Sequence, residues 1–165
     1  MKIRTGHLRN FIGMKKQSAG ILLYRFQKKT LEVLLVHPGG PFWKKKDDGA
    51  WTIPKGEFTR NEEPLQAAIR EFEEETGQPV RGNFIPLTPA KQKSGKLVHA
   101  WAVEGALDEK NIRSNSFEIE WPPRSGKQQS FPEIDRADWF TPENAKQKIN
   151  PAQAVFIDEL AALLK

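Results

Sequence analysis

The sequence predicts an α/β fold, in which extended segments surround one amphipathic helix and further helices close the chain. Three observations carry this prediction. Apolar residues recur at three- and four-residue spacing over residues 64–76, which indicates a helix with one buried face. Residues 18–26 and 31–37 read as two strands joined by a short polar turn. Residues 142–149 and 151–164 are typical of helices at the end of the chain.

Further extended segments are expected on both sides of the central helix. The chain predicts a short strand at 51–54, and later extended segments at 80–87, 96–104, 117–121 and 134–140. Segment 117–121 alternates cleanly between apolar and polar residues, as a half-buried strand does. The last helix should pack through its apolar side, which comprises Val155, Phe156, Ile157, Leu160, Leu163 and Leu164.

The central helix has clear start and stop signals. Pro64 suits the first helical position, and Gly77 suits the position just past the end, where a left-handed residue closes the last turn. At about 100° per residue, one buried stripe should contain Leu65, Ala68, Ile69, Phe72 and Thr76. By the same geometry Glu71, Glu74 and Glu75 lie within an arc of about 100° beside that stripe. Three carboxylates therefore share one side of the helix.

Composition limits the class of protein. One hundred and sixty-five residues suffice for one ordinary domain with a sizeable core. The chain has no cysteine, which excludes disulfides, thiolate catalysis and cysteine-based metal sites. With no long apolar run and no signal-like start, we expect a cytoplasmic protein that does not enter a membrane. Residues 1–13 are predicted to form an irregular basic arm, and residues 14–165 a single domain.

The glutamate cluster has two interpretations. A run such as Glu73-Glu74-Glu75 is commonly a solvated helix face. However, like charges one turn apart repel, and the negative end of the helix dipole disfavours anions in the last turns, so a cation should compensate. Arg70 can neutralise one charge, by pairing with Glu62 or Glu71. The remaining carboxylate oxygens favour Mg²⁺, a hard cation that binds carboxylates together with substrate phosphate oxygens.

The spacing of the fixed positions decides between these interpretations. Gly56, Glu62, the pair Arg70-Glu71, the pair Glu74-Glu75 and Gly77 stand at the spacing of the Nudix box, and the chain resembles the Nudix hydrolase family (MutT-like) at each of these charged or glycine positions. Two apolar positions of the box differ. Phe72 stands where the family usually has an aliphatic residue, and Gln78 is polar where an aliphatic residue normally ends the box.

The resemblance implies an α/β/α sandwich around a mixed β-sheet and hydrolysis of a diphosphate linked to another moiety. It also implies dependence on Mg²⁺, or alternatively Mn²⁺, held by Glu71, Glu74 and Glu75 with the Gly56 carbonyl. Arg70 and Glu71 would belong to the catalytic residues, with Glu62 as an ion-pair partner. Glu133 is similar in position to the late-loop glutamate of MutT-like members and is a candidate general base, with Glu118 and Glu120 as rivals.

Candidate substrate contacts come from the entry to the box and from two basic loops. Pro54-Lys55-Gly56 resembles the box entry of dinucleoside polyphosphate hydrolases, which makes Lys55 a candidate. Trp43 precedes Lys44-Lys45-Lys46, and Trp121 precedes a loop with Arg124 and Lys127; an aromatic ring beside cations suits a nucleotide. A simple core role is preferred for Trp101 and remains the alternative for Trp121. The three histidines show no ligand spacing, and we expect structural roles for them.

The partner expected is therefore a small-molecule nucleotide. The leading interpretation is a nucleoside or dinucleoside polyphosphate, and ADP-ribose or another nucleoside diphosphate sugar is the alternative substrate. A nucleotide-sensing module without turnover is the alternative of a different class, although a sensor does not need all the acids of the box. The net charge of +5 also raises nucleic-acid binding, which is disfavoured because no helix carries a continuous basic stripe.

Overall fold

The computed structural model describes residues 16–165, and the predicted arm at 1–13 lies outside them. The described chain contains nine strands, which are β1 (Gln17–Gln27), β2 (Thr30–Pro38), β3 (Lys55–Glu57), β4 (Ile85–Pro86), β5 (Ala90–Lys91), β6 (Leu97–Glu104), β7 (Ser116–Glu120), β8 (Gln128–Pro132) and β9 (Ile134–Phe140). Its helices are α2 (Pro64–Thr76), α3 (Pro142–Lys148) and α4 (Ala154–Leu163), with 3₁₀ turns η1 (Glu109–Asn111) and η2 (Pro151–Gln153).

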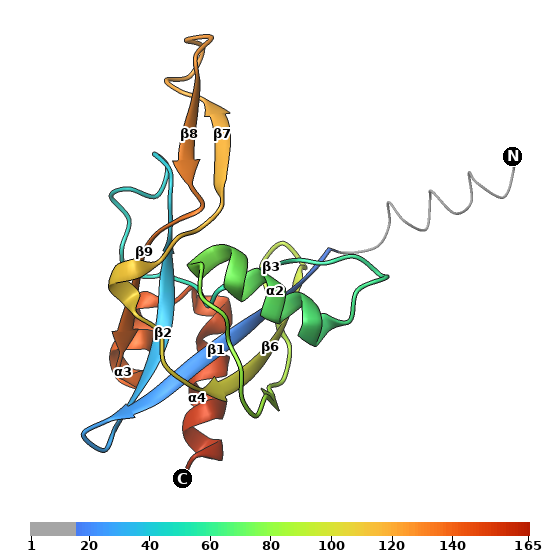
Figure 1. The fold of residues 1–165 in the computed structure, drawn as a ribbon, viewed down its shortest axis with the longest axis vertical. Coiled ribbons are helices and arrows are strands. Elements are labelled where there is room, and N and C mark those ends of the chain that lie inside the picture. Colours follow the sequence, from blue (N-terminus) through green and yellow to red (C-terminus); the bar gives the residue numbers. More distant parts are fainter. Residues whose placement is uncertain (1–15) are drawn as a thin grey trace, which may run out of the picture.

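A seven-stranded mixed sheet forms the centre of the molecule (Figure 1). Its main path has the order β4-β6-β1-β2-β9, while β3 pairs with β1 and β5 pairs with β6. Strands β1 and β6 run parallel over eight residue pairs, from Gln17 opposite Leu97 to Tyr24 opposite Glu104, and the other pairings are antiparallel. The parallel pair in an otherwise antiparallel sheet makes the sheet mixed, as predicted.

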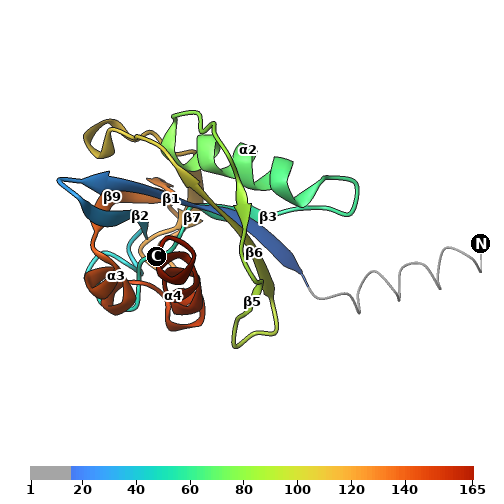
Figure 2. The ribbon, with the colours of Figure 1, turned by 90° about the horizontal axis from the view of Figure 1, so that it is seen from below.

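Helices cover both faces of this sheet. Figure 2 shows α2 on one face and α3 with α4 on the other. Strand β1 serves both layers, because its side chains alternate: Ile21 and Leu23 pack under α2, whereas Leu22 and Tyr24 pack under α4. The predicted α/β/α sandwich is therefore confirmed. Among the described helices, none is both long and apolar enough to span a bilayer.

Helix α2 begins and ends where the sequence predicted. Pro64 occupies the first turn, and Gly77 adopts a left-handed conformation with φ of 75°. The buried residues include Ala68, Phe72 and Thr76, as expected, and also Ala67, which the predicted stripe left out. Leu65 and Ile69 are only partly buried and pack at the margin of the core. The stripe is thus rotated towards Ala67, because the sheet meets the helix through its small residues.

Both unusual residues of the Nudix-like box have a structural role. Phe72 is 1% exposed within the core under α2. Gln78 ties the box to the 3₁₀ turn η1: its Nε2 donates to Asp108 O at 2.9 Å, and its Oε1 accepts from Asp108 N at 3.1 Å. An aliphatic residue could not make these two bonds. The aromatic side chain therefore docks the helix, and the amide fixes the chain that follows it.

Several extended segments differ from the sequence-based expectation. Residues 51–54 contribute only isolated bridges, and the regular strand β3 follows them at Lys55–Glu57. Within 80–87 only Ile85–Pro86 forms a strand. Strands β5 and β8 were not expected, because Ala90-Lys91 is too short and Gln128-Gln129-Ser130-Phe131-Pro132 has a single strongly apolar residue. The last predicted helix divides into η2 and α4.

The apolar side of the last helix is narrower than predicted. Phe156, Ile157 and Leu160 are buried, but Val155 and Leu163 are about half exposed, at 53% and 52%. Helix α4 packs on the sheet through its three buried residues and also contacts α3 and η2, so Val155 and Leu163 stay at its solvent side.

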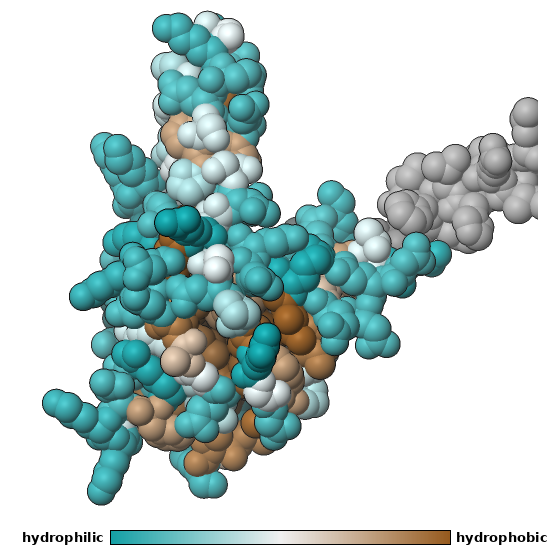
Figure 3. Space-filling view, viewed as in Figure 1, coloured by the Kyte–Doolittle hydropathy of each residue, from teal (hydrophilic) through white to brown (hydrophobic). Residues whose placement is uncertain are grey.

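Strands β7 and β8 form a separate two-stranded hairpin. It rises away from the sandwich in Figure 1, and in the space-filling view it stands as a mostly hydrophilic column with a few apolar patches (Figure 3). Phe117 and Phe131 are cross-strand partners, with ring centroids 6.1 Å apart. The segment predicted as the strand 117–121 therefore belongs to this projection and not to the central sheet.

The burial of Phe72 leads to a first prediction. Phe72→Ala should lower the free energy of unfolding by about 3–5 kcal/mol, because truncating a buried aromatic leaves a cavity. Urea denaturation of the purified variant measures this loss. The control Val155→Ala removes apolar atoms from an exposed helical position and should change stability by less than about 0.5 kcal/mol. Equal losses in the two variants would contradict the packing described for α2.

Candidate functional site

The C-terminal half of α2 carries the predicted acidic cluster. The helix is closed by Gly77, whose backbone N–H donates to Glu73 O at 2.7 Å, and by the Thr76 hydroxyl, which donates to Phe72 O at 2.7 Å. The first of these bonds satisfies a carbonyl that would otherwise lack a partner at the end of the helix, and the second gives the buried Thr76 hydroxyl a partner. The last turn is therefore well formed, and Glu71, Glu74 and Glu75 are held at fixed positions beside the buried stripe.

Arg70 joins three of the carboxylates of the box. Its Nε and Nη2 donate to the two oxygens of Glu62 at 2.7 and 2.9 Å, a bidentate pair. Its Nη1 donates to Glu71 Oε1 at 2.9 Å and to Glu74 Oε2 at 3.1 Å. These contacts raise the pKa of Arg70, chiefly through Glu62. One guanidinium thus offsets repulsion between two neighbouring glutamates while a third carboxylate anchors it.

Strand β3 lies directly against these glutamates. A Cβ atom built on Gly56 would fall on the Glu71 carboxyl group, so only glycine leaves room for that group. The backbone N–H of Lys55 donates to Glu75 Oε1 at 3.2 Å. The close approach of β3 therefore places the backbone of residues 55–56 beside two acids of the box.

Burial shifts the protonation of several groups at this site. The pKa of Glu75 is raised to about 8, mainly because burial disfavours its charged form, with the Glu71 charge adding to the effect. Burial also raises the pKa of Glu71 and of Glu133, and Glu74 adds to the shift of Glu133. The pKa of the Lys55 ammonium is lowered, again chiefly by burial. Shifts of this kind at one cluster are typical of a functional site.

Backbone hydrogen bonds connect Glu133 to the box helix. Asn115 N donates to Glu74 O at 3.1 Å, Glu133 N donates to Asn115 O at 2.8 Å, and Gly39 N donates to Glu133 O at 2.8 Å. Gly39 lies so close to the Pro132 carbonyl that it has no space for a side chain. The backbone of Glu133 is therefore fixed from two sides.

The structure brings some predicted site residues together and keeps others apart. Glu133 and Lys55 lie close to the box acids. The charges of both residues interact with those of Glu71 and Glu75. Arg124 and Lys127 instead lie in the turn of the β7–β8 hairpin, at the other end of β8 from Glu133. Trp43 is 38% exposed in the loop after β2, where the Lys46 ammonium lies 4.9 Å from its ring centroid.

The other two candidate bases and two tryptophans lie on the hairpin or at the margin of the core. Glu118 and Glu120 are exposed on β7, on the hairpin face opposite to Phe117 and Ile119. Trp101 is partly buried at the margin of the core, close to its expected role. Trp121 is no core residue, because it lies on the hairpin with its ring edge-on to Phe42 at 5.4 Å.

His37 has the structural role expected for the histidines. It is fully buried, with Nδ1 2.8 Å from Asp135 Oδ1 and Nε2 2.7 Å from Lys46 O. It thereby ties the end of β2 to the loop that follows. Sequence reasoning missed Gly39 and Asn115, which position the candidate base; the glycine pair at 39–40, directly after a strand, was the signal available for the first of them.

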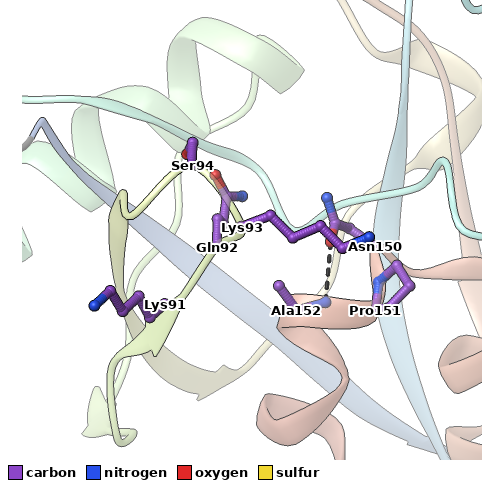
Figure 4. Close-up of a pocket in the computed structure, with 7 residues that line it drawn as sticks. All are labelled: Lys91, Gln92, Lys93, Ser94, Asn150, Pro151 and Ala152. Carbon is purple, nitrogen blue, oxygen red and sulfur yellow. Dashed lines mark hydrogen bonds between the residues drawn. The ribbon is translucent and has the colours of Figure 1, made fainter.

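Two surface depressions lie away from the box acids. One, of about 720 Å³, is lined by residues 91–94 and 150–152, and Figure 4 shows Lys93 extending across it towards Asn150. The other, of about 530 Å³, is lined partly by Trp51, Arg136 and Lys148. Neither of these two depressions includes a residue of the box. The carboxylate cluster therefore lies apart from both, between α2, β3 and Glu133.

The donor set fits a divalent cation. Among residues 16–165, no three His, Cys, Asp or Glu side chains are already arranged as a metal site, and the carboxylates of Glu71 and Glu74 both accept hydrogen bonds from Arg70 Nη1. The same oxygens, with those of Glu75 and the carbonyl of Gly56, are hard donors on adjacent elements. Because Gly56 has no side chain, the Glu71 carboxyl group has room to lie against β3.

Comparison with known proteins agrees with this geometry. A family model, the NUDIX domain, matches residues 14–160. The chain belongs to the Nudix family. Membership confirms the predicted relation to the Nudix hydrolases, and the Nudix box is the segment from Gly56 to Gly77.

Solved structures show the same fold at low sequence identity. A C. elegans Ap4A hydrolase complex is 22% identical, with a TM-score of 0.64 over 90% of this chain and 97% of the other. The NUDIX domain of Shewanella oneidensis NrtR, complexed with ADP ribose, is 15% identical, with a TM-score of 0.64 over 98% of each chain. The Nudix hydrolase RenU from M. smegmatis has a TM-score of 0.60 at 20% identity, over 92% of this chain and 88% of that one.

One curated relative shares part of its sequence with this chain. An octanoyltransferase of Myxococcus xanthus is 31% identical over 101 residues, which is 61% of this chain and 25% of that protein. This chain thus matches about a quarter of the length of that relative.

The raised pKa of Glu75 leads to a second prediction, for the protein in EDTA. Between the pKa of about 4.5 expected for an unfolded glutamate and the value of about 8 in the fold, the folded state holds a proton that the unfolded state has released. Stability should therefore fall as pH rises from 5 to 8, by an amount on the order of a few kcal/mol at most.

The Glu75→Gln variant tests this dependence. Urea denaturation at several pH values should show that the fall is strongly reduced in Glu75→Gln. The control Glu73→Gln, an exposed position of the same helix, should keep the fall of the unmodified protein. If Glu75→Gln and the unmodified protein lose stability in parallel, another group titrates and the burial of Glu75 is not the cause.

Proposed function

We propose that this protein hydrolyses a diphosphate linkage in a nucleoside or dinucleoside polyphosphate, with Mg²⁺ as cofactor. The observation that carries the proposal is the convergence of three box glutamates, Glu133 and Lys55 on one surface. Such a cluster suits a reaction in which a cation holds phosphate oxygens and a carboxylate accepts a proton.

Glu71, Glu74 and Glu75 would hold the cation, and the Gly56 carbonyl would complete the protein ligands. Oxygen ligands of this kind select Mg²⁺, with Mn²⁺ as the alternative. Bound there, the cation would offset charge on the diphosphate and favour attack by water. Arg70 would hold Glu71 and Glu74 in position through Nη1, while its bidentate bond to Glu62 keeps the guanidinium from moving with them.

Glu133 is the general base that we propose. Its carboxyl group has a pKa raised by burial and by the charge of Glu74, which brings it towards the range where a base accepts protons efficiently. Its backbone is fixed relative to Glu74 by the bonds through Asn115. Lys55 lies among the same acids and is suited to contact a phosphate oxygen of the substrate.

Nucleoside diphosphate sugars, including ADP-ribose, are the second candidate substrates. The specific observation is the equal similarity in fold to the NrtR domain that was solved with ADP ribose and to the Ap4A hydrolase. Turnover separates both enzymatic candidates from a nucleotide-sensing module. The test is to incubate purified protein and Mg²⁺ with a panel of nucleoside polyphosphates, dinucleoside polyphosphates and ADP-ribose. We expect the nucleoside or dinucleoside polyphosphates to be hydrolysed. Binding without any hydrolysis in the whole panel would refute the enzymatic proposal.

The third prediction concerns the base. Glu133→Gln should lower kcat by about 10²–10⁴ with little change in KM, because the amide cannot accept the proton. The unmodified protein should lose activity at low pH as Glu133 becomes protonated, and this acidic limb should disappear from the profile of the variant. Rates measured from pH 5 to 9 test both effects.

Glu118→Gln is the matched control for the base. It removes a carboxylate of the same hairpin from the face that points away from the aromatic residues. This variant should keep the rate and the pH profile. A near-normal rate in Glu133→Gln would instead assign the proton to Glu71 or Glu120.

The fourth prediction concerns the cation. Glu74→Gln should sharply reduce hydrolysis and raise the Mg²⁺ concentration needed for half-maximal rate, because one ligand oxygen loses its charge. The fold should persist in EDTA, since the change also removes one of the like charges on α2. Titration of the rate with Mg²⁺ and thermal unfolding in EDTA measure the two effects. Full activity at limiting Mg²⁺ would exclude Glu74 as a ligand.

A further inference from the structure

The loop after β2 and the β7–β8 hairpin form one continuous surface. Gly40 lies against the ring of Phe117, and Phe42 meets Trp121 edge-on, with 5.4 Å between the ring centroids and 77° between the ring planes. The loop therefore extends along the hairpin from its root towards its turn (Figure 1). We call this the hairpin surface, which consists of residues 40–46 together with Phe117, Trp121, Arg124 and Lys127.

Large aromatic side chains are exposed on the hairpin surface. Phe42 is 64% exposed and Trp43 38%, and these are among the few large hydrophobic residues at the surface of the described chain. Trp121 is partly buried, and its ring packs edge-on against Phe42. Adjacent exposed aromatic rings mark binding sites, because leaving them in water is unfavourable. The rings offer flat apolar faces of the kind on which a nucleobase stacks.

Cations near these rings in the chain lack acidic partners. Within residues 16–165, no carboxylate lies within 4.0 Å of the ammonium groups of Lys44, Lys45 or Lys127, or of the Arg124 guanidinium. In the same loop, by contrast, Asp47 and Asp48 are both paired with Lys148. Glu118 and Glu120 project from the other face of the hairpin. The hairpin surface therefore combines exposed aromatic rings with cations that have no acidic partner, and it suits an anionic ligand with a base.

The position of the surface limits the ligand to an extended one. Glu133 forms the root of the hairpin beside the box acids, and Lys127 stands six positions before it in the chain. At about 3.3 Å per residue the turn lies roughly 20 Å along the strand from the root. A ligand that contacts both ends needs phosphates at the box and a base well beyond them.

We infer that the hairpin surface binds the second nucleoside, and the phosphates next to it, of a dinucleoside polyphosphate whose first diphosphate lies at the box acids. This inference rests on the proposed function and narrows its substrate class. Phe42 and Trp121 contact the distal nucleoside, while Lys44, Lys45, Arg124 and Lys127 supply the positive charge that attracts its phosphates. A mononucleotide at the box does not reach them.

Binding measured without turnover tests the inference. The probes are a dinucleoside tetraphosphate with non-hydrolysable methylene bridges and a methylene-bridged analogue of ATP, both titrated with Mg²⁺ present. The double variant Arg124→Gln/Lys127→Gln should bind the dinucleoside compound about tenfold more weakly and the ATP analogue with unchanged affinity. Lys44→Gln/Lys45→Gln should act in the same direction, and the difference should shrink at high salt, which screens exposed charges.

Lys28→Gln/Lys29→Gln is the matched control. It removes two exposed cations from the β1–β2 turn, at the opposite end of the molecule from the hairpin (Figure 1). The control should leave both affinities unchanged. Trp121→Leu keeps apolar bulk beside Phe42, removes the indole face, and should selectively weaken the dinucleoside compound.

Three outcomes would overturn the inference. Unchanged affinity of the dinucleoside compound in both charge variants would remove the surface from substrate binding. An equal loss for both probes would mean that the cations act through general electrostatics. Tighter binding of a single-stranded oligonucleotide, lost in the same variants, would assign the surface to nucleic acid. Because binding is read without hydrolysis, each outcome is independent of whether turnover of these compounds is found.

Discussion

Arg70 is the residue on which the geometry of the box depends. Its guanidinium donates hydrogen bonds from two edges: Nε and Nη2 bind Glu62, and Nη1 binds both Glu71 and Glu74. A lysine has no planar fork and could not make both sets of bonds. Without this cation, carboxylates one turn apart at the negative end of a helix would repel each other and turn outwards. The acidic cluster therefore contains its own counterion, the Arg70 guanidinium.

The end of helix α2 connects this cluster to the rest of the site. Its last carbonyls need partners, and the segment at 113–115 supplies them through Arg113 N to Thr76 O and Asn115 N to Glu74 O. The same segment leads into the hairpin and accepts the bond from Glu133 N. One local requirement, the capping of a helix, thus also sets the distance between the box glutamates and the candidate base. Rigid backbone of this kind is what positions catalytic groups accurately.

The parts of the fold that the sequence predicted are those governed by local rules. Helix α2 has a proline at its start, a glycine at its end and a regular apolar period between, and its bounds were predicted correctly. Strand β9 and the β1–β2 pair likewise have strong apolar patterns. Strand β8 has no such pattern, because it is solvated on a projecting hairpin, where Phe131 is its one partly buried residue.

The candidate site divides in the same way. Residues within the box keep a fixed spacing on one helix, so their common side followed from helical geometry. The proximity of Glu133 came from a resemblance and not from residue patterns, because it depends on hydrogen bonds between segments far apart in the chain, such as Gly39 with Glu133. Trp121 was open to a core interpretation, since a tryptophan in an alternating strand looks the same in sequence whether it lies on a sheet or on a projection.

The anchoring of Glu133 has a consequence for how this fold can diversify. Both hydrogen bonds that fix its backbone lie at the root, below the hairpin, and the close packing of Gly39 on Pro132 is at the same level. Residues beyond the root do not take part in these bonds. Evolution or an engineer can therefore lengthen, shorten or replace the hairpin while the acid at its base stays in register with α2. The hairpin can in this sense be exchanged while the candidate site stays constant, so that new ligands become accessible without rebuilding that site.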